Sequence, residues 1–448
     1  MPEVTTLDFR QSLENLKKTK PQLHIQLRKV EETSIYCRFA VHKIVQNMSQ
    51  TKVDYGLTLM NEKQQISTYH FNEELTEARL KEIVDEQEKR LTHSPALDYK
   101  PEWTTVQKTW NDPHAPVSAS QLYESLHAHF QESEKRNWDN FAGLLSHKKQ
   151  KVSLFNTQGG ALVQEKSRIQ WEASIFKDQY EINTTQLALS PTELVSTSFH
   201  QLSDQWLQLP NRSFRGESGP RILLSPQALA QILDYLLHTD HFNAYKVRMQ
   251  SSALQKYLKG SELLFSPLIN LNDDPSSTRM GYTAFDDVGN LRSEIRIIEK
   301  GLFQQELFNE REAQMANRPK SHRSGHTHSY RENSAYAYDL SLEGGQENGD
   351  MFAVLDHGYY LHDVHYLSLA DSQKLTLYGL TRGGFLEVQN GRPAAKVGNM
   401  RFEVSLFDLF RQVEALGACE EVPGWTGLVR CPTMVTRGLQ FTQAATNL

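Results

Sequence analysis

The sequence predicts an α+β protein, with an N-terminal antiparallel sheet that carries helices, followed by a β-rich C-terminal domain. Two observations predict this fold. Up to about residue 180, runs with the alternating period of half-buried strands are separated by segments of helical period. Beyond residue 263, short strand-like runs are joined by turns rich in Gly, Asp and Asn. The polar stretch 209–220 separates the two parts, which we place at 1–215 and 216–448.

The elements of the first part follow from the period of each segment. Helical spacing predicts helices at about 7–18, 72–91 and 120–136. Alternation predicts antiparallel strands at 23–27, 35–41, 53–59, 152–154 and 169–175. The proline-bearing stretch 92–120 predicts an irregular crossing. A turn at 156–160 joins the last two strands, and we expect Gly159 and Gly160 to supply positive φ there.

A strongly patterned helix opens the second part. Ser225 is the predicted N-cap, and Pro226 takes the first helical position. Apolar residues then recur at the spacing of one buried stripe: Leu229, Ile232, Leu233, Leu236 and Leu237. Turn sequences separate the short strands that follow, at 272–275, 286–290, 343–350, 381–384 and 389–392. We expect these strands to be mostly antiparallel and to leave few free edges.

Composition excludes several classes of protein. With 48 Lys and Arg against 54 Asp and Glu, the net charge is −6, which makes nucleic acid an improbable partner. The three cysteines, Cys37, Cys419 and Cys431, include no CxxC pair, so they build neither a disulfide framework nor a four-cysteine zinc site. No stretch is apolar enough to cross a membrane. We therefore expect a cytoplasmic protein without a membrane partner.

Histidines are conspicuous in one stretch of the second part. Six of the 17 lie close together in sequence: His322, His326, His328, His357, His362 and His365. Neutral imidazole is the commonest metal ligand, but 313–331 contains no acidic residue to complete a site. For 322–328 we therefore favour a loop of solvated, partly cationic side chains. His238 and His241 could share a metal only if their helix continues, and we favour a helix-end role for them.

Two further patterns have both a functional and an ordinary interpretation. The acidic pairs could bind a divalent cation or act in acid/base chemistry, but Asp before Pro or Gly is also common in turns, which we favour: Asp273, Asp274, Asp286 and Asp287. Arg382, Gly383 and Gly384 could form a cradle for a carboxylate or a peptide main chain, or simply a glycine-requiring turn. We take these three as candidates for peptide or partner contact.

No strong catalytic motif is present. The sequence has no GxGxxG between a strand and a helix, no GxxxxGK[ST], no GxSxG and no HExxH. From composition and spacing alone, the chain is a two-domain α+β protein of undefined activity.

An ordered series of segments, however, resembles the TldD/PmbA family, whose members are known as modulators of DNA gyrase and as metallopeptidases. In the first part the resemblance rests on GLLSHKKQKVSLFNTQGG (143–160). In the second part the segments are RILLSPQALAQILDYLL (221–237), INLNDDP (269–275), AFDDVGN (284–290), RIIEKGLFQQELFNEREA (296–313), HRSGHTH (322–328), GYYLHDVHYL (358–367), LTRGGFLEVQNGRPAAKV (380–397) and CPTMVTRGLQF (431–441).

The family contains two kinds of subunit, and this chain resembles the PmbA (TldE)-like kind that lacks HExxxH. The metal-bearing kind carries HExxxH on the helix that corresponds to 226–237, and a later cysteine completes its zinc site. Here Asp234 and Tyr235 stand near the positions of that His and Glu, and Cys419 stands near the cysteine. The resemblance implies a peptide-degrading or peptide-maturing complex, with an extended peptide as substrate. It implies zinc in a TldD-like partner and no cofactor in this chain.

Two alternatives stay open at this point. One is a stand-alone metal-dependent hydrolase that uses a site of its own, built from His326, His328, His357, His362 or His365, with Cys419. The other is a non-catalytic protein that binds peptides or proteins. For the partner, self-association is the alternative to a TldD-like subunit. The resemblance does not decide whether this chain is itself an enzyme, and the acidic net charge gives little support to contact with gyrase.

Overall fold

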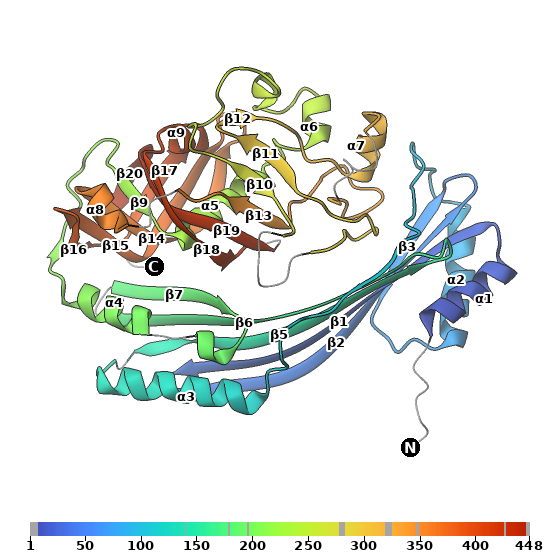
Figure 1. Ribbon diagram of the computed structural model, residues 1–448, viewed down its shortest axis with the longest axis horizontal. Coiled ribbons are helices and arrows are strands. Elements are labelled where there is room, and N and C mark those ends of the chain that lie inside the picture. The colour runs from blue at the N-terminus through green and yellow to red at the C-terminus, as the bar shows by residue number, and fades with distance from the viewer. Residues whose placement is uncertain are drawn as a thin grey trace.

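The computed structural model describes residues 8–138, 140–177, 180–194, 197–276, 283–318, 325–345, 349–424 and 427–444. Their strands form two large sheets, one of long curved strands and one in the β-rich second part (Figure 1). The predicted α+β class is confirmed. Within the described residues, no helix is long and apolar enough to cross a membrane.

The first sheet has the strand order β3-β2-β1-β5-β6-β4, with β7 added on β6. Its strands are β1 (Leu23–Ala40), β2 (Lys43–Asn61), β3 (Ile66–Phe71), β4 (Gln107–Trp110), β5 (Phe141–Asn156), β6 (Ala161–Lys177) and β7 (Tyr180–Ala188). The prediction of separate strands at 23–27 and 35–41 is wrong, because both belong to β1. The polar stretch between them stays extended because β2 and β5 pair with it on both sides.

Helices cover the two ends of this sheet (Figure 1). They are α1 (Phe9–Thr19), α2 (Glu77–Leu91), α3 (Ala119–Lys135) and α4 (Thr197–Gln208). In Figure 1, α1 and α2 lie at one end of the sheet and α3 and α4 at the other. Local sequence sets where the first three begin: Asp8 and Thr76 cap α1 and α2, and Ser118 forms a capping box with Gln121 at α3. The apolar stripes of α1 and α2 pack into one core with β1 and β2, as the helical period predicts.

The β5–β6 hairpin and the crossing before it differ from prediction in two details. Gly159 has φ +91°, as expected, but Gly160 does not adopt a positive φ. Glycine is required at position 160 because no side chain fits there: a Cβ would lie 2.2 Å from the backbone oxygen of Thr104. The crossing 92–120 also contains β4, which runs parallel to β6.

The second sheet contains thirteen strands within the described residues. They are β8 (Asn211–Arg212), β9 (Ile222–Leu224), β10 (Leu271–Asp273), β11 (Ile295–Glu299), β12 (Leu302–Phe303), β13 (Asp339–Leu342), β14 (Gly358–Asp371), β15 (Thr376–Gln389), β16 (Arg392–Val397), β17 (Met400–Ser405), β18 (Ala415–Pro423), β19 (Leu428–Thr436) and β20 (Leu439–Ala444). The helices are α5 (Pro226–His238), α6 (Ala244–Arg248), α7 (Glu310–Met315), α8 (Met351–Leu355) and α9 (Leu406–Arg411). Helix α5 confirms the predicted helix, with Ser225 as its N-cap.

The two parts share apolar contacts. One core cluster combines Phe39 and Trp171 of the first sheet with Leu223 and Leu386 of the second. The division at 1–215 and 216–448 stays a prediction, although β8 at Asn211–Arg212 already pairs with the second sheet.

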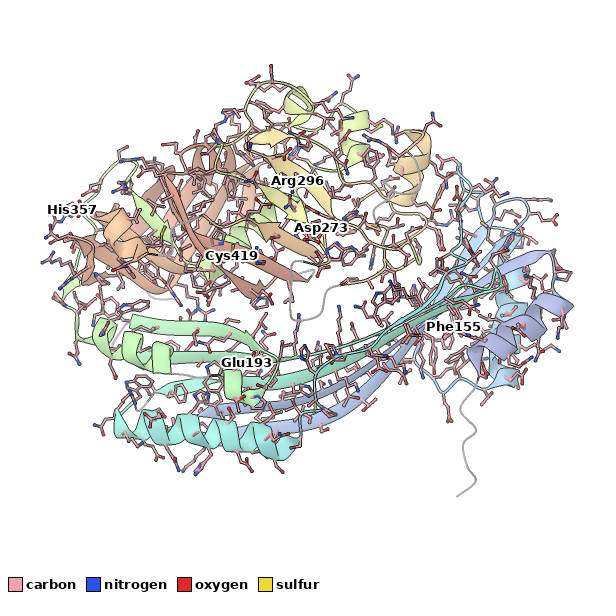
Figure 2. All side chains as sticks on the ribbon, in the orientation of Figure 1. Phe155, Glu193, Asp273, Arg296, His357 and Cys419 are labelled. Atoms are coloured by element: carbon pink, nitrogen blue, oxygen red, sulfur yellow. The ribbon has the colours of Figure 1, made fainter. Side chains whose placement is uncertain are left out.

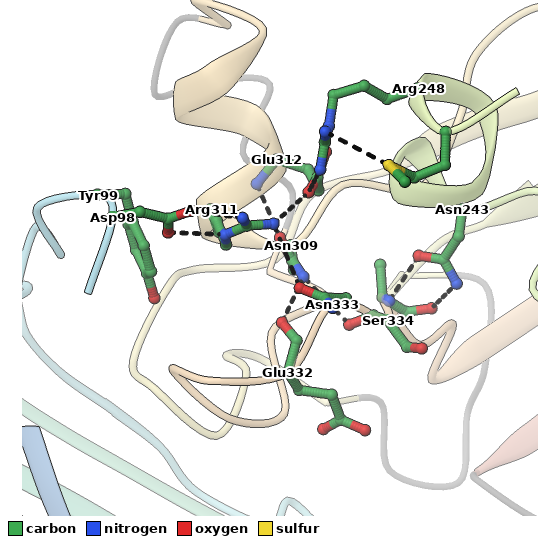
Figure 3. Close-up of polar contacts among 12 residues, drawn as sticks. Asp98, Tyr99, Asn243, Arg248, Asn309, Arg311, Glu312, Glu332, Asn333 and Ser334 are labelled. Carbon is green, nitrogen blue, oxygen red and sulfur yellow. Dashed lines mark hydrogen bonds and ion pairs between the residues drawn. The ribbon is translucent and has the colours of Figure 1, made fainter. Parts of the chain in front are cut away.

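Polar contacts also join the two parts at helix α7 (Figure 3). Arg311 of α7 binds Asp98 of the first part and Glu312 beside it, and Glu312 also receives both Nε and Nη2 of Arg248 at 2.7 and 2.9 Å. Glu312 is 2% exposed, so these partners compensate the cost of burying its charge. Asn309, the N-cap of α7, donates a hydrogen bond to the backbone oxygen of Glu332. Glu332 lines a cavity described below.

Candidate functional site

A cavity of about 440 Å³ lies where strands β1, β5, β6 and β7 of the first sheet meet the β14–β15 hairpin. We call it the Arg382 cavity. The polar and charged side chains that line it come from both parts: Arg38, Glu172, Ser174, Asn183, Asp363 and Arg382. One of the three predicted contact residues thus lies at a cavity wall.

Arg382 makes a two-point ion pair with Glu181 of β7. Its Nε and Nη2 lie 3.0 and 2.9 Å from the two carboxylate oxygens of Glu181, which also accepts the Ser174 hydroxyl at 2.8 Å. Burial opposes ionisation of Glu181, but Arg382 outweighs it and lowers the pKa of this carboxyl. The guanidinium is therefore held in place, with 38% of the side chain exposed for further contact.

Gly383 and Gly384 form a β-bulge, in which they oppose the single residue His362 of β14. Gly383 has φ +62°, and a Cβ there would lie 2.1 Å from Oδ1 of Asn183. Gly384 has φ +127°, and a Cβ there would lie 3.3 Å from side-chain carbons of both His362 and Trp206. Both glycines are needed for close packing against the first part. Their role in peptide contact stays a prediction.

Asp363 connects this cavity to helix α5. It is 3% exposed and accepts hydrogen bonds from Asn183 Nδ2 at 2.7 Å and from Gln231 Nε2 of α5 at 2.5 Å. Burial raises its pKa, against the effect of Asn183 and Arg382. The part of the cavity wall around Asp363 is therefore a buried polar network.

The residues that the resemblance puts near the HExxxH motif and its cysteine, all within the described part of the chain, are not arranged as metal ligands. Asp234 is 3% exposed and lies so close to Gly424 that a Cβ there would be 2.4 Å from its Oδ2. Tyr235 packs against the apolar core. The Cys419 thiol donates to the Leu342 backbone oxygen at 3.4 Å, and burial raises its pKa, which disfavours the metal-binding thiolate. These donors do not fit zinc.

The predicted histidine alternative is not supported by the described residues, because their imidazoles have separate partners. His326 contacts Asp273, His328 contacts Asp287, His357 is exposed beside Asp356, and His362 contacts the Asn183 backbone oxygen at 2.7 Å. Figure 2 shows His357 at the rim of the second part, away from Asp273. No group of three His, Cys, Asp or Glu able to hold a metal occurs within the described ranges, and His322 lies outside them.

The helix-end interpretation is correct for His238, at which α5 ends, but not for His241, which lies beyond the helix and is 0% exposed. His238 Nδ1 lies 2.6 Å from the Asp234 backbone oxygen, and His241 accepts the Ala253 amide at 2.9 Å. Burial lowers the pKa of His241 to about 4, so it is neutral at physiological pH.

The prediction of a solvated loop at 322–328 is wrong for His326, which is 0% exposed. Its Nε2 lies 2.5 Å from Oδ2 of Asp273, and Arg292 bridges Asp273 to Asp339. Burial disfavours the charge of Asp273, but Arg292 and His326 outweigh it and lower the pKa of this carboxyl. The partner of His326 lies 53 residues away in sequence, which is why the lack of nearby acidic residues misled the prediction.

The turn interpretation of the acidic pairs is correct for two of the four residues. Asp274 accepts the Ser276 amide at 2.8 Å, and Asp286 accepts the amide of Asn290 at 2.8 Å. It is wrong for Asp273, which lies on β10 in the buried ionic cluster. Asp287 forms ion pairs with Arg28 and His328 rather than capping a turn.

Sequence reasoning missed a second cavity, of about 510 Å³, which we call the Lys166 cavity. It lies between β1, β5 and β6 of the first sheet and loops of the second part. Its lining includes Arg28, Gln150, Lys166, Asp287, His328 and Tyr338, with Phe285 and Tyr336. No signal in the sequence pointed to it beyond Lys166 itself, a lysine that the fold places on β6.

The fold defines a class of protein in which a long curved sheet carries a β-rich second part. Residues 218–443 match the family profile of the PmbA/TldA metallopeptidase C-terminal domain. Because this match covers half of the chain, the chain belongs to the PmbA/TldD family. A search of curated proteins finds no match.

Solved structures share the fold over nearly the whole chain. A candidate modulator of a DNA gyrase from Thermotoga maritima is 16% identical, with a TM-score of 0.79 and coverage of 97% of this chain and 99% of that one. TldE from Thermococcus kodakarensis is 14% identical, with a TM-score of 0.79 and coverage of 96% and 100%. A candidate modulator of DNA gyrase from Bacteroides thetaiotaomicron is 14% identical, with a TM-score of 0.75 and coverage of 97% and 98%. At these identities the likeness concerns the fold alone.

Proposed function

We propose that this chain is the PmbA/TldE-like subunit of a TldD/PmbA-type metallopeptidase complex that degrades or matures unfolded peptides. The proposal is supported by helix α5, where the resemblance puts Asp234 and Tyr235 near the positions of His and Glu in the metal-bearing subunit. Asp234 is buried against Gly424 and Tyr235 packs on the core, so neither is placed to activate water. A TldD-like partner would supply the zinc.

The role of this chain in such a complex is to hold an extended peptide or to contact the partner. The Arg382 cavity supports this role because it combines a fixed guanidinium with neighbouring polar side chains. A guanidinium can donate to a carboxylate or to peptide oxygens. We therefore keep Arg382, Gly383 and Gly384 as the proposed contact residues, and we place the complex in the cytoplasm because the sparse cysteines suit a reducing compartment.

The test compares the chain alone with the chain co-expressed with a TldD-like protein from the same genome. We expect zinc by mass spectrometry, and chelator-sensitive hydrolysis of an unfolded peptide, only in the co-purified complex. An isolated chain that holds about one zinc and hydrolyses the peptide would refute the proposal. Co-purification without any hydrolysis would instead support the non-catalytic binding protein.

A variant of the contact residue refines this test. Arg382→Ala in the complex should raise the KM for the peptide or weaken partner binding, whereas Arg296→Ala should change neither. Arg296 is a matched control because it is also paired to glutamates but lies on β11, where its side chain is 45% exposed. Equal behaviour of the two variants would remove Arg382 from the proposed contact surface.

A further inference from the structure

The charged side chains of the Lys166 cavity are matched by partners, with one exception. Arg28 Nη2 lies 2.7 Å from Oδ1 of Asp287, and His328 Nδ1 lies 2.6 Å from Oδ2 of the same carboxylate. Glu332 accepts the Tyr336 hydroxyl at 2.8 Å. These groups hold one another in place and satisfy one another's charge or hydrogen bonds.

Lys166 is the exception. Its ammonium group donates to the Thr283 hydroxyl at 3.4 Å, which is long for a hydrogen bond. Within the described part of the chain, no carboxylate lies within ion-pair distance of it, although it lines the cavity. A lysine ammonium has three donors, so at least two directions remain available to a ligand.

A neighbouring hydroxyl is also available. Tyr338 lines the same cavity, and its hydroxyl oxygen is buried without a hydrogen-bond partner among the described residues. Buried polar atoms in native proteins nearly always have a partner, so this group calls for one. The Arg292 guanidinium lies 5.1 Å from the centre of the Tyr338 ring and fixes its position.

We propose that the Lys166 cavity binds a small ligand through a carboxylate, with the Lys166 ammonium as counter-ion and the Tyr338 hydroxyl as a second donor. Phe285 and Tyr336 provide an apolar wall for the part of the ligand beside the carboxylate. A volume of about 510 Å³ lies in the range of small-molecule sites. The carboxylate belongs either to a free organic acid or to the C-terminus of a short peptide.

The electrostatics of the cavity agree with this assignment. Burial is the main cause that lowers the pKa of Lys166 to about 8; Asp339 acts against it, and Arg168, Arg292 and Arg28 act with it. At pH 7 the amine is still largely protonated, and its charge is incompletely compensated. A bound carboxylate would compensate that charge in partly buried surroundings, where the attraction is stronger than in water.

Calorimetric titration of the isolated full chain tests the proposal with three probes. They are the tripeptide alanyl-alanyl-phenylalanine, its C-terminal amide, and N-acetylphenylalanine. We expect the tripeptide to bind and the amide to bind at least about tenfold more weakly, because the amide lacks the charge that Lys166 recognises. N-acetylphenylalanine binding as tightly as the tripeptide would identify a free acid as the ligand, and binding of the tripeptide alone would identify a peptide C-terminus.

Two variants locate the binding. Lys166→Met should weaken binding at least about tenfold, whereas Lys166→Arg, which keeps the charge, should stay within a few-fold of the original protein. Lys149→Met is the control, because Lys149 lies on the adjacent strand β5 with a side chain that is 48% exposed. Failure of all three probes to bind at millimolar concentration, or unchanged binding to Lys166→Met, would overturn the proposal.

Amine labelling provides a measurement that needs no variant. N-hydroxysuccinimidyl acetate transfers its acetyl group to neutral amines, with loss of N-hydroxysuccinimide, and mass spectrometry reads each lysine separately. The tripeptide at saturating concentration should slow labelling of Lys166 several-fold and leave Lys149 unchanged. Equal labelling of Lys166 with and without the tripeptide would refute the site. Because these tests use the isolated chain, their failure leaves the proposed subunit role untouched.

Discussion

Replacing Lys166 by methionine is expected to stabilise the protein, because Lys166 is a charged group in surroundings that disfavour its charge. Burial is the main cause that lowers its pKa from 10.5 to about 8. At about 1.4 kcal/mol per pKa unit, this difference favours the unfolded state by about 3 kcal/mol at pH 7. Water reaches part of the side chain, so we expect the methionine variant to gain about 1–3 kcal/mol.

The pH dependence of this gain has a definite sign. Between pH 8 and 10.5, the unfolded chain keeps the Lys166 proton while the folded chain releases it. The unfolded state then binds more protons, so the stability of the original protein rises with pH across this window. The advantage of Lys166→Met should therefore be full below pH 8 and about half as large at pH 9.5.

Urea unfolding followed by tryptophan fluorescence at pH 7 and pH 9.5 measures both quantities. Lys149→Met serves as the control, since an exposed lysine should change the free energy of unfolding by less than about 0.5 kcal/mol. A gain due only to the apolar methionine side chain would be the same at both pH values. The reasoning is refuted if Lys166→Met is less stable than the original protein at pH 7, or if its gain does not shrink at pH 9.5.

Three further substitutions test other parts of the structure by the same unfolding assay. Arg292→Met should cost about 3–5 kcal/mol, because it leaves two buried carboxylates without their shared cation; a cost below 1 kcal/mol would contradict the buried cluster. Gly383→Ala should cost at least about 2 kcal/mol more than Gly216→Ala, because both have positive φ but only the Gly383 position would bring a Cβ against another side chain; equal costs would contradict the close packing. Glu312→Gln should cost about 1.5–3 kcal/mol, since Glu312 is 2% exposed and binds two arginines, whereas the exposed Glu294→Gln should be nearly neutral.

Local signals in the sequence predicted the elements whose formation depends on local physics. Helix α5 begins at Ser225 and Pro226 because capping and a fixed proline φ are properties of neighbouring residues. The length of β1 was not predictable in this way. Its polar centre carries no alternation, and it is a strand because β2 and β5 supply hydrogen bonds on both sides.

The candidate site residues also differ in whether neighbouring sequence or distant segments determine their surroundings. Arg382 was singled out because a glycine-rich turn beside an arginine is a local pattern, and the β-bulge explains why two glycines stand there. His326 was misjudged because its partner Asp273 comes from β10, far away in sequence. Lys166 was missed because its surroundings are built by Arg28, Thr283 and Tyr338, from segments that only the fold brings together.

The buried cluster and the Lys166 cavity are electrostatically linked. Arg292 has two carboxylate partners, and its guanidinium also lies over Tyr338 and contributes to lowering the pKa of Lys166. The cluster is no source of net positive charge, because Arg292 is balanced by two carboxylates and lowers the pKa of Lys166 less than Asp339 raises it. Asp339, which shares Arg292, raises the pKa of Lys166 and so favours the protonated amine. A carboxylate ligand in the cavity would compensate the charge of that amine, which has no carboxylate within ion-pair distance among the described residues.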